Sequence, residues 1–210
     1  MKNYAKLTSW LIGAWFVLVL TLSAIHVFAA SPNQPPLTFG LAVATPILAF
    51  FVWFATSPAF RKFTLSLSPQ VLTLVQSWRI GGFVFLVLAT YGILPRIFAW
   101  PAGWGDIIIG ATAAFVALKL AVPRHRASFI VWQLLGIADL VTAVTMGTLA
   151  SIIDPQGITT SAMSVLPLSL IPTFAVPLFL IFHVISIAQA RQWAPRQSQQ
   201  ARGSLPLQAL

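Results

Sequence analysis

Four side chains that can carry charge lie inside long apolar stretches of this sequence, and they are its strongest candidates for chemistry. They are Arg79, Asp106, Asp139 and His183. The whole chain has only three acidic residues, so most of its negative charge stands in apolar surroundings. A charged group near the middle of a lipid bilayer costs about 3 kcal/mol or more unless it has a partner. We therefore expect these residues to pair with one another or to line a path.

The first expected contact is an ion pair between Arg79 and Asp139. A helical rise of about 1.5 Å per residue puts each of them about 15 Å from one end of its apolar stretch, close to the middle of the membrane. Gln76 lies one turn from Arg79 and shares its face. Gly136 shares a face with Asp139 and lets a neighbouring helix approach closely. The predicted polar core, which would bind a small solute or ion, consists of Arg79, Asp139, His183, Gln76 and Gln133.

Two interpretations of this core stay open. In one, the ion pair only holds two helices together. In the other, the polar groups line a solute or proton path, as ionisable groups inside membranes often do. Anions would then be the expected cargo, because Arg79 stays charged and one carboxylate neutralises it only once. Proton coupling would use His183, whose imidazole switches charge near neutrality. Kinks at Pro172 and Pro177 would open the cavity.

Asp106 is expected to play a different part, because its helix is predicted to begin at about residue 103. In a first turn the helix dipole favours a carboxylate, and Arg96 in the preceding loop could pair with it. That loop, over about residues 94–105, is rich in proline, glycine and aromatic residues. It could roof an outer vestibule formed by Arg96, Trp100, Trp104 and Asp106.

Six apolar stretches must position these groups. With 7% charged and 58% hydrophobic residues, the chain could not cover the surface of a soluble fold. Each stretch is about as long as the roughly 20 residues that a membrane-spanning helix needs, and nothing resembles the alternation of a membrane barrel. The sequence predicts an all-α, polytopic transmembrane bundle over about residues 1–190, with spans at about 7–29, 37–56, 69–94, 103–121, 128–152 and 165–190.

The basic residues predict the orientation of this bundle. Of the 12 Lys and Arg residues, ten fall on one side of the predicted membrane, while Arg96 is on the other and Arg79 is inside. Basic residues collect on the cytoplasmic side, so both termini are expected there. Residues 191–210 are predicted to be a basic, disordered cytoplasmic tail that can touch anionic lipid. The stretch ending at Val27-Phe28-Ala29 also resembles a cleavable signal peptide, but its length favours an uncleaved span.

Several classes of protein are disfavoured. The chain has no cysteine, which removes disulfides, thiolate metal sites and thiol nucleophiles. The basic residues form no stripe with interleaved aromatics, so no nucleic acid partner is expected. No motif of a soluble enzyme is present, and no metal or cofactor is predicted. Two-histidine haem ligation is disfavoured because His26 and His183 lie at levels about 10–15 Å apart.

Several segments carry a family resemblance. They are Gln76-Ser-Trp-Arg79, Pro101-Ala-Gly-Trp-Gly-Asp106, Trp132-Gln-Leu-Leu-Gly136-Ile-Ala-Asp139 and Ile171-Pro-Thr-Phe-Ala-Val-Pro177. Over about residues 70–189 the chain resembles a family of small, uncharacterised multi-pass bacterial membrane proteins. The resemblance implies a place in the bacterial inner membrane and adds no chemistry.

Three functional classes therefore remain. The first is a small transporter or channel-like protein with a polar core at the midplane. The second is a non-transporting subunit, chaperone or lipid-interacting scaffold. An intramembrane enzyme or a single-histidine haem protein is third. A water-filled cavity at Arg79 would favour the first class, whereas a dry and fully paired Arg79 would favour the second. Membrane lipids are the expected partners in each case.

Overall fold

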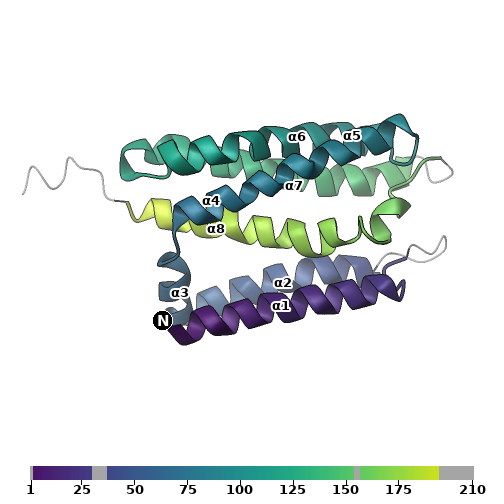
Figure 1. The fold of residues 1–210 in the computed structure, drawn as a ribbon. Coiled ribbons are helices and arrows are strands. Elements are labelled where there is room, and N and C mark those ends of the chain that lie inside the picture. The colour runs from purple at the N-terminus through teal and green to yellow at the C-terminus, as the bar shows by residue number, and fades with distance from the viewer. Residues whose placement is uncertain (1, 30–36, 154–156, 194–210) are drawn as a thin grey trace, which may run out of the picture.

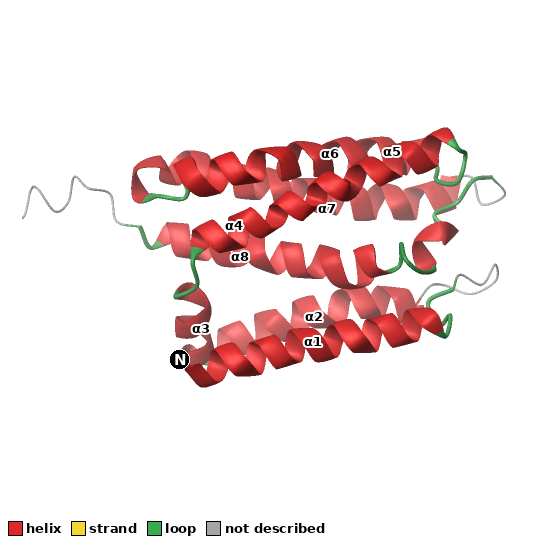
Figure 2. Cartoon of the chain, viewed as in Figure 1, coloured by secondary structure: helices red, strands yellow, loops and turns green. Residues whose placement is uncertain are grey.

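The described part of the chain, residues 2–29, 37–153 and 157–193 of a computed structural model, is built from helices and contains no strand (Figure 2). Six helical segments are long and apolar enough to cross a membrane: Asn3–Ala24, Thr38–Thr56, Pro69–Thr90, Arg96–Leu120, Pro123–Ala150 and Ile171–Arg191. The prediction of an all-α bundle with six spans is therefore confirmed, and the chain is a multi-pass membrane protein.

The first two spans are single helices, α1 (Lys2–Ala24) and α2 (Leu37–Thr56), and a short helix α3 (Pro58–Leu65) follows them. The third span joins α4 (Pro69–Val75), a 3₁₀ segment η1 (Gln76–Gly82) and α5 (Phe83–Thr90). The fourth joins α6 (Arg96–Phe115) to a π-helical turn η2 (Val116–Leu120). The fifth is α7 (Arg126–Ile153), preceded by η3 (Pro123–His125). After η4 (Ser161–Ser164), the sixth joins a π-helical turn η5 (Ile171–Ala175) to α8 (Val176–Arg191).

The last four spans form the main bundle. The segment α4–η1–α5 packs against α6, α6 against α7, and α7 against α8, which returns to α4 (Figure 1). Between 28% and 39% of each of these spans is buried. By contrast, very few residues of α1 and α2 are buried, because these helices lie along one side of the bundle against η5 and α8. The core that could hold a site is therefore in the second half of the chain.

Serine–proline pairs set the start of two helices. Ser57 and Ser68 precede prolines at the first helical position, and their hydroxyl oxygens accept hydrogen bonds from the backbone N–H groups of Phe60 and Val71. Both features are favourable at a helix start, where backbone donors lack partners. They turn the chain twice within a short segment, so that α3 runs across the ends of the spans while α4 enters the bundle (Figure 1).

The predicted boundaries were furthest from the observed ones at two places, in the fourth and sixth spans. The fourth span begins at Arg96 with Pro95 as its cap, so residues 96–105 are helical and the predicted loop is absent. Pro101 lies inside that helix, where a proline removes only one backbone bond and is tolerated in membrane helices. The sixth helix begins at Ile171 instead of about residue 165, after a stretch of turns. The loop at residues 30–36, Asp154 and the predicted tail from residue 194 lie outside the described residues.

Candidate functional site

Arg79 is the centre of a polar core in which three other spans meet the third. Its side chain is buried, with 3% of the residue exposed. Nε donates to Oδ1 of Asp106 at 2.7 Å, and Nη2 donates to Oδ2 of Asp139. Nη1 contacts Nε2 of His183 at 3.2 Å and donates to the carbonyl of Gly136 at 3.3 Å. The predicted contact between Arg79 and Asp139 is therefore present, but Arg79 has two carboxylate partners instead of one.

The expectations for Asp106 and the outer vestibule do not agree with this arrangement. Because α6 starts at Arg96, Asp106 lies about 15 Å into the helix and not in its first turn. Its carboxylate binds Arg79, not Arg96. Trp100 and Trp104 are about half exposed along α6. The four residues thus do not gather around a vestibule, and the sequence-based view that Asp106 and Asp139 lie at different depths was wrong.

The 3₁₀ segment η1 explains why the polar residues of the third span line up. In a 3₁₀-helix, side chains three positions apart lie directly above one another. Gln76, Arg79 and Gly82 have this spacing, and all three are buried. Thr73, which lies three residues before Gln76 in α4, is also buried. The sequence analysis missed Thr73, although the three-residue spacing of Thr73, Gln76 and Arg79 is visible in the sequence.

A series of hydrogen bonds runs from Arg79 towards the start of α4. The hydroxyl of Thr73, at the end of the series, determines which partner donates in each bond. The hydroxyl of Thr73 donates to the carbonyl of Pro69 at 2.7 Å, so its oxygen accepts from Nε2 of Gln133 at 3.1 Å. The other end of that amide, Oε1, can only accept, so Nδ1 of His183 donates to it. Nε2 of His183 then accepts from Arg79, which has donors only. Every hydrogen bond in this series is therefore donated in the direction from Arg79 to Pro69.

This direction assigns a role to His183. With Nδ1 protonated and Nε2 accepting, the imidazole is neutral, and a second proton would face the guanidinium of Arg79. The ring is fully buried and lies 5.7 Å from that of Trp132, between centroids. His183 therefore positions Arg79, and the sequence-based suggestion that it carries a proton does not fit this geometry.

Four glycines make room for the polar core. A Cβ atom at Gly136 would overlap the imidazole of His183, and one at Gly105 would overlap the carboxylate of Asp139. At Gly82 a Cβ would overlap the side chain of Asp106. At Gly110 it would meet the backbone of η1 at Arg79 and Ile80. The charged groups thus sit where helices approach most closely, as small residues permit in membrane bundles.

The core holds more negative than positive charge if both carboxylates are ionised. One guanidinium faces two aspartates, which leaves one negative charge. Both side chains keep a small accessible surface, 16% for Asp106 and 12% for Asp139. Among the described residues, no donor reaches Oδ2 of Asp106 or Oδ1 of Asp139. The sequence predicted anions as cargo because a single aspartate would neutralise Arg79 only once. Two aspartates beside one arginine disfavour anion binding.

The remaining residues of the core are tightly enclosed. Gln76, Gln133 and His183 are at most 1% exposed, and Nε2 of Gln76 donates to the carbonyl of Phe179 at 3.2 Å.

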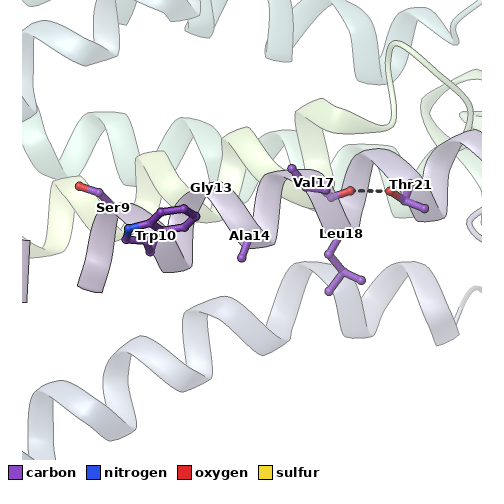
Figure 3. Close-up of a pocket in the computed structure, with 7 residues that line it drawn as sticks. All are labelled: Ser9, Trp10, Gly13, Ala14, Val17, Leu18 and Thr21. Carbon is purple, nitrogen blue, oxygen red and sulfur yellow. Dashed lines mark hydrogen bonds between the residues drawn. The ribbon is translucent and has the colours of Figure 1, made fainter. Parts of the chain in front are cut away.

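Two hollows occur elsewhere on the surface. One, of about 780 Å³, follows Ser9, Gly13, Val17 and their neighbours along α1 (Figure 3). The other lies beside α3. Neither hollow reaches Arg79. No group of three or more metal-binding side chains occurs in the described ranges.

The fold and the site together define a class: a multi-pass α-helical membrane protein with a buried arginine–aspartate core. The chain belongs to the family described as "Domain of unknown function (DUF8737)", whose match covers residues 36–191. All residues of the polar core fall within that range, whereas α1 lies before it. Comparison with curated proteins and with solved structures finds no match.

Proposed function

We propose that this protein is a small transporter of the bacterial inner membrane that binds and releases a proton at the carboxylates around Arg79. The observation that supports the proposal is the unequal charge count of the core. A clip between two helices requires only one carboxylate for one guanidinium. A second buried carboxylate adds a desolvation cost of several kcal/mol if it is charged. A proton on one of the two carboxylates removes that cost and leaves the core electrically neutral, with one positive and one negative charge.

The acceptor atoms for this proton are Oδ2 of Asp106 and Oδ1 of Asp139. Among the described residues neither has a donor, while the second oxygen of each carboxylate is held by Arg79. The guanidinium stays charged throughout and favours the ionised form of its partners. Loss of the proton adds a negative charge between α6 and α7, which changes the attraction of both helices to η1. A seven-residue 3₁₀ segment is longer than usual, and such segments often mark hinges.

The test is proton flux through the purified protein in vesicles. A pH-sensitive dye is enclosed, and a pH gradient is applied with potassium and valinomycin present to remove any electrical barrier. We expect the wild type to dissipate the gradient, and Asp106→Asn and Asp139→Asn each to abolish the flux. Each variant retains one aspartate for Arg79, so both should fold. Asp154→Asn, the same change at the third acidic residue of the chain, serves as the control and should keep the flux.

A second candidate is a non-transporting scaffold, which the buried and paired Arg79 favours by the criterion given from the sequence, since neither hollow reaches it. The second carboxylate is the observation that favours transport over this candidate. Arg79, Gln76, Gln133 and His183 are buried and hydrogen-bonded, as expected of groups that only fix the arrangement of helices. In that case wild type and aspartate variants leak protons at the rate of empty vesicles. This result, with correctly folded protein, would reject the transport proposal and leave the scaffold.

We also propose that both termini face the cytoplasm. The start of α1, α3, the turn between α6 and α7 and the end of α8 lie at one end of the bundle (Figure 1). The described basic residues of that end are Lys6, Arg61, Lys62, Lys119, Arg124, Arg126 and Arg191, against Arg96 at the other end. This imbalance predicts a cytoplasmic location.

Reporter fusions check the orientation. A fluorescent protein fused after Arg202 should be active, and alkaline phosphatase fused at the same point should be inactive. Phosphatase fused near Gly157, between α7 and α8, should be active because that connection faces the periplasm. The opposite pattern at either site would overturn the proposed orientation.

A further inference from the structure

The short helix α3 has the form of a helix that lies in the membrane surface. It runs across the ends of the spans, at the end of the bundle where the basic residues gather (Figure 1). Its residues Phe60, Phe63 and Thr64 are buried, whereas Arg61 and Lys62 are exposed. An apolar face beneath a basic face is the pattern of helices that lie at the boundary between lipid headgroups and acyl chains.

Aromatic rings fix the depth of α3. The rings of Trp53 and Phe60 stack with centroids 3.9 Å apart and an interplanar angle of 2°. Phe63 stacks on Tyr4 of α1 at 5.9 Å. Tyrosine and tryptophan side chains concentrate at membrane–water interfaces. The cluster joins the start of α1 and the end of α2 to α3, and thus holds Arg61 and Lys62 at the end of the spans.

The end of α3 is anchored to the last span. Nε2 of Gln189 in α8 donates to the carbonyl of Leu67 at 2.6 Å and contacts those of Thr64 and Leu65 at 3.3 Å. Helix carbonyls at a C-terminus lack partners within the helix, so this amide satisfies groups that would otherwise face the boundary unpaired. The basic face of α3 is therefore held in place relative to α8 before any ligand binds.

A hollow of about 380 Å³ lies between α3 and the end of α8. Its lining is formed by Pro58, Arg61, Lys62, Leu65, Ser66 and Gln192. No carboxylate of the described residues neutralises the two basic groups, because Asp106 and Asp139 are both bound to Arg79 in the core. The third acidic residue, Asp154, follows α7 in the sequence and lies outside the described residues. The hollow is therefore a basic pocket at the end of the spans.

We propose that this pocket binds the phosphate of an anionic phospholipid, with Arg61 and Lys62 holding the phosphate and the acyl chains lying along the bundle. The side-chain amide of Gln192 adds a donor for a headgroup oxygen. Phosphate recognition by a guanidinium and an ammonium is charge-assisted and strong. The inference is independent of proton transport, since the pocket lies at the bundle end and the polar core at mid-membrane.

Lipid binding in detergent tests the proposal. The purified full-length chain is titrated with phosphatidylglycerol or phosphatidylcholine, and bound lipids are counted by native mass spectrometry. We expect phosphatidylglycerol to bind more tightly than phosphatidylcholine. Each basic residue near an anionic lipid contributes about fivefold in affinity, so the double variant Arg61→Gln/Lys62→Gln should bind phosphatidylglycerol about 25-fold more weakly. Both side chains are exposed, so the variant should unfold at the wild-type temperature.

The control is Lys119→Gln/Arg124→Gln, which removes the same charge from exposed positions at the same end of the bundle. It should change the affinity by less than about twofold, because neither residue lines the pocket. Equal losses in both double variants would mean diffuse charge attraction and would overturn the proposal. Inorganic phosphate at millimolar concentration should not displace the lipid, and displacement would instead assign the pocket to a soluble anion.

Discussion

Arg79→Gln should lower the yield of folded protein more than any other single substitution in the core. The change leaves two aspartates without their positive partner and removes the donor to His183. Removing one member of a buried ionic network costs about 3 to 5 kcal/mol, which is a large part of the stability of a typical domain. The yield of monodisperse protein after extraction in mild detergent, and its unfolding temperature, would measure the loss.

Neutralising the aspartates supplies the matched control. The triple variant Arg79→Gln/Asp106→Asn/Asp139→Asn removes all three charges and should recover much of the yield. Asp139→Asn alone should be mild, since Asp106 still balances Arg79. The sequence predicted Asp139 as the only partner of Arg79, and Asp139→Asn would then have left Arg79 unpaired. If the triple variant is as poor as the sum of its parts, the three residues do not act as a unit.

Gly110→Ala should destabilise the bundle by about 1 to 3 kcal/mol, because an added Cβ would push into packed groups. The groups that it meets are backbone atoms of Arg79 and Ile80, which cannot rotate away as the tip of a side chain can. The methyl group would separate α6 from η1 and lengthen the ion pair of Arg79 with Asp106. Thermal unfolding in detergent, followed by tryptophan fluorescence, would show the lower midpoint.

Gly81→Ala is the comparison for this prediction. Gly81 lies in η1 beside Gly82, but nothing is within 4 Å of the position where its Cβ would stand. Alanine also favours a helix over glycine by about 1 kcal/mol, so this variant should be neutral or slightly more stable. Similar losses at Gly81 and Gly110 would show that the crossing is not as close as the structure has it.

The six spans and the Arg79–Asp139 contact were predictable because each depends on one simple physical rule. Backbone groups in lipid must bond within their own helix, so an apolar stretch of about 20 residues has few alternatives. Arg79 and Asp139 were paired from depth alone, since a rise per residue converts sequence position into height. Both predictions needed the length of a helix and not its rotation about its own axis.

The position of Asp106 could not be predicted in the same way. Its depth depends on where α6 begins, and Pro101 and Gly103 favour a loop by local propensity. Packing against the third and fifth spans overrides that propensity, and Ala99 and Ala102 are buried at the contact. The orientation of the hydrogen-bond chain was also hidden, because it depends on which end of Gln133 faces Thr73. Such information lies in contacts between distant segments and not in local pattern.

The family match begins at residue 36, so five of the six spans belong to it and α1 stands before them. A segment with an odd number of crossings starts and finishes on opposite sides of the bilayer. Because α1 is the first of six spans, α2 starts at the far end of the bundle. The start of α1 then lies at the same end as the end of α8 (Figure 1). In the orientation proposed above, Lys2 and Lys6 at the start of α1 lie on the same side of the membrane as the basic residues of the later turns.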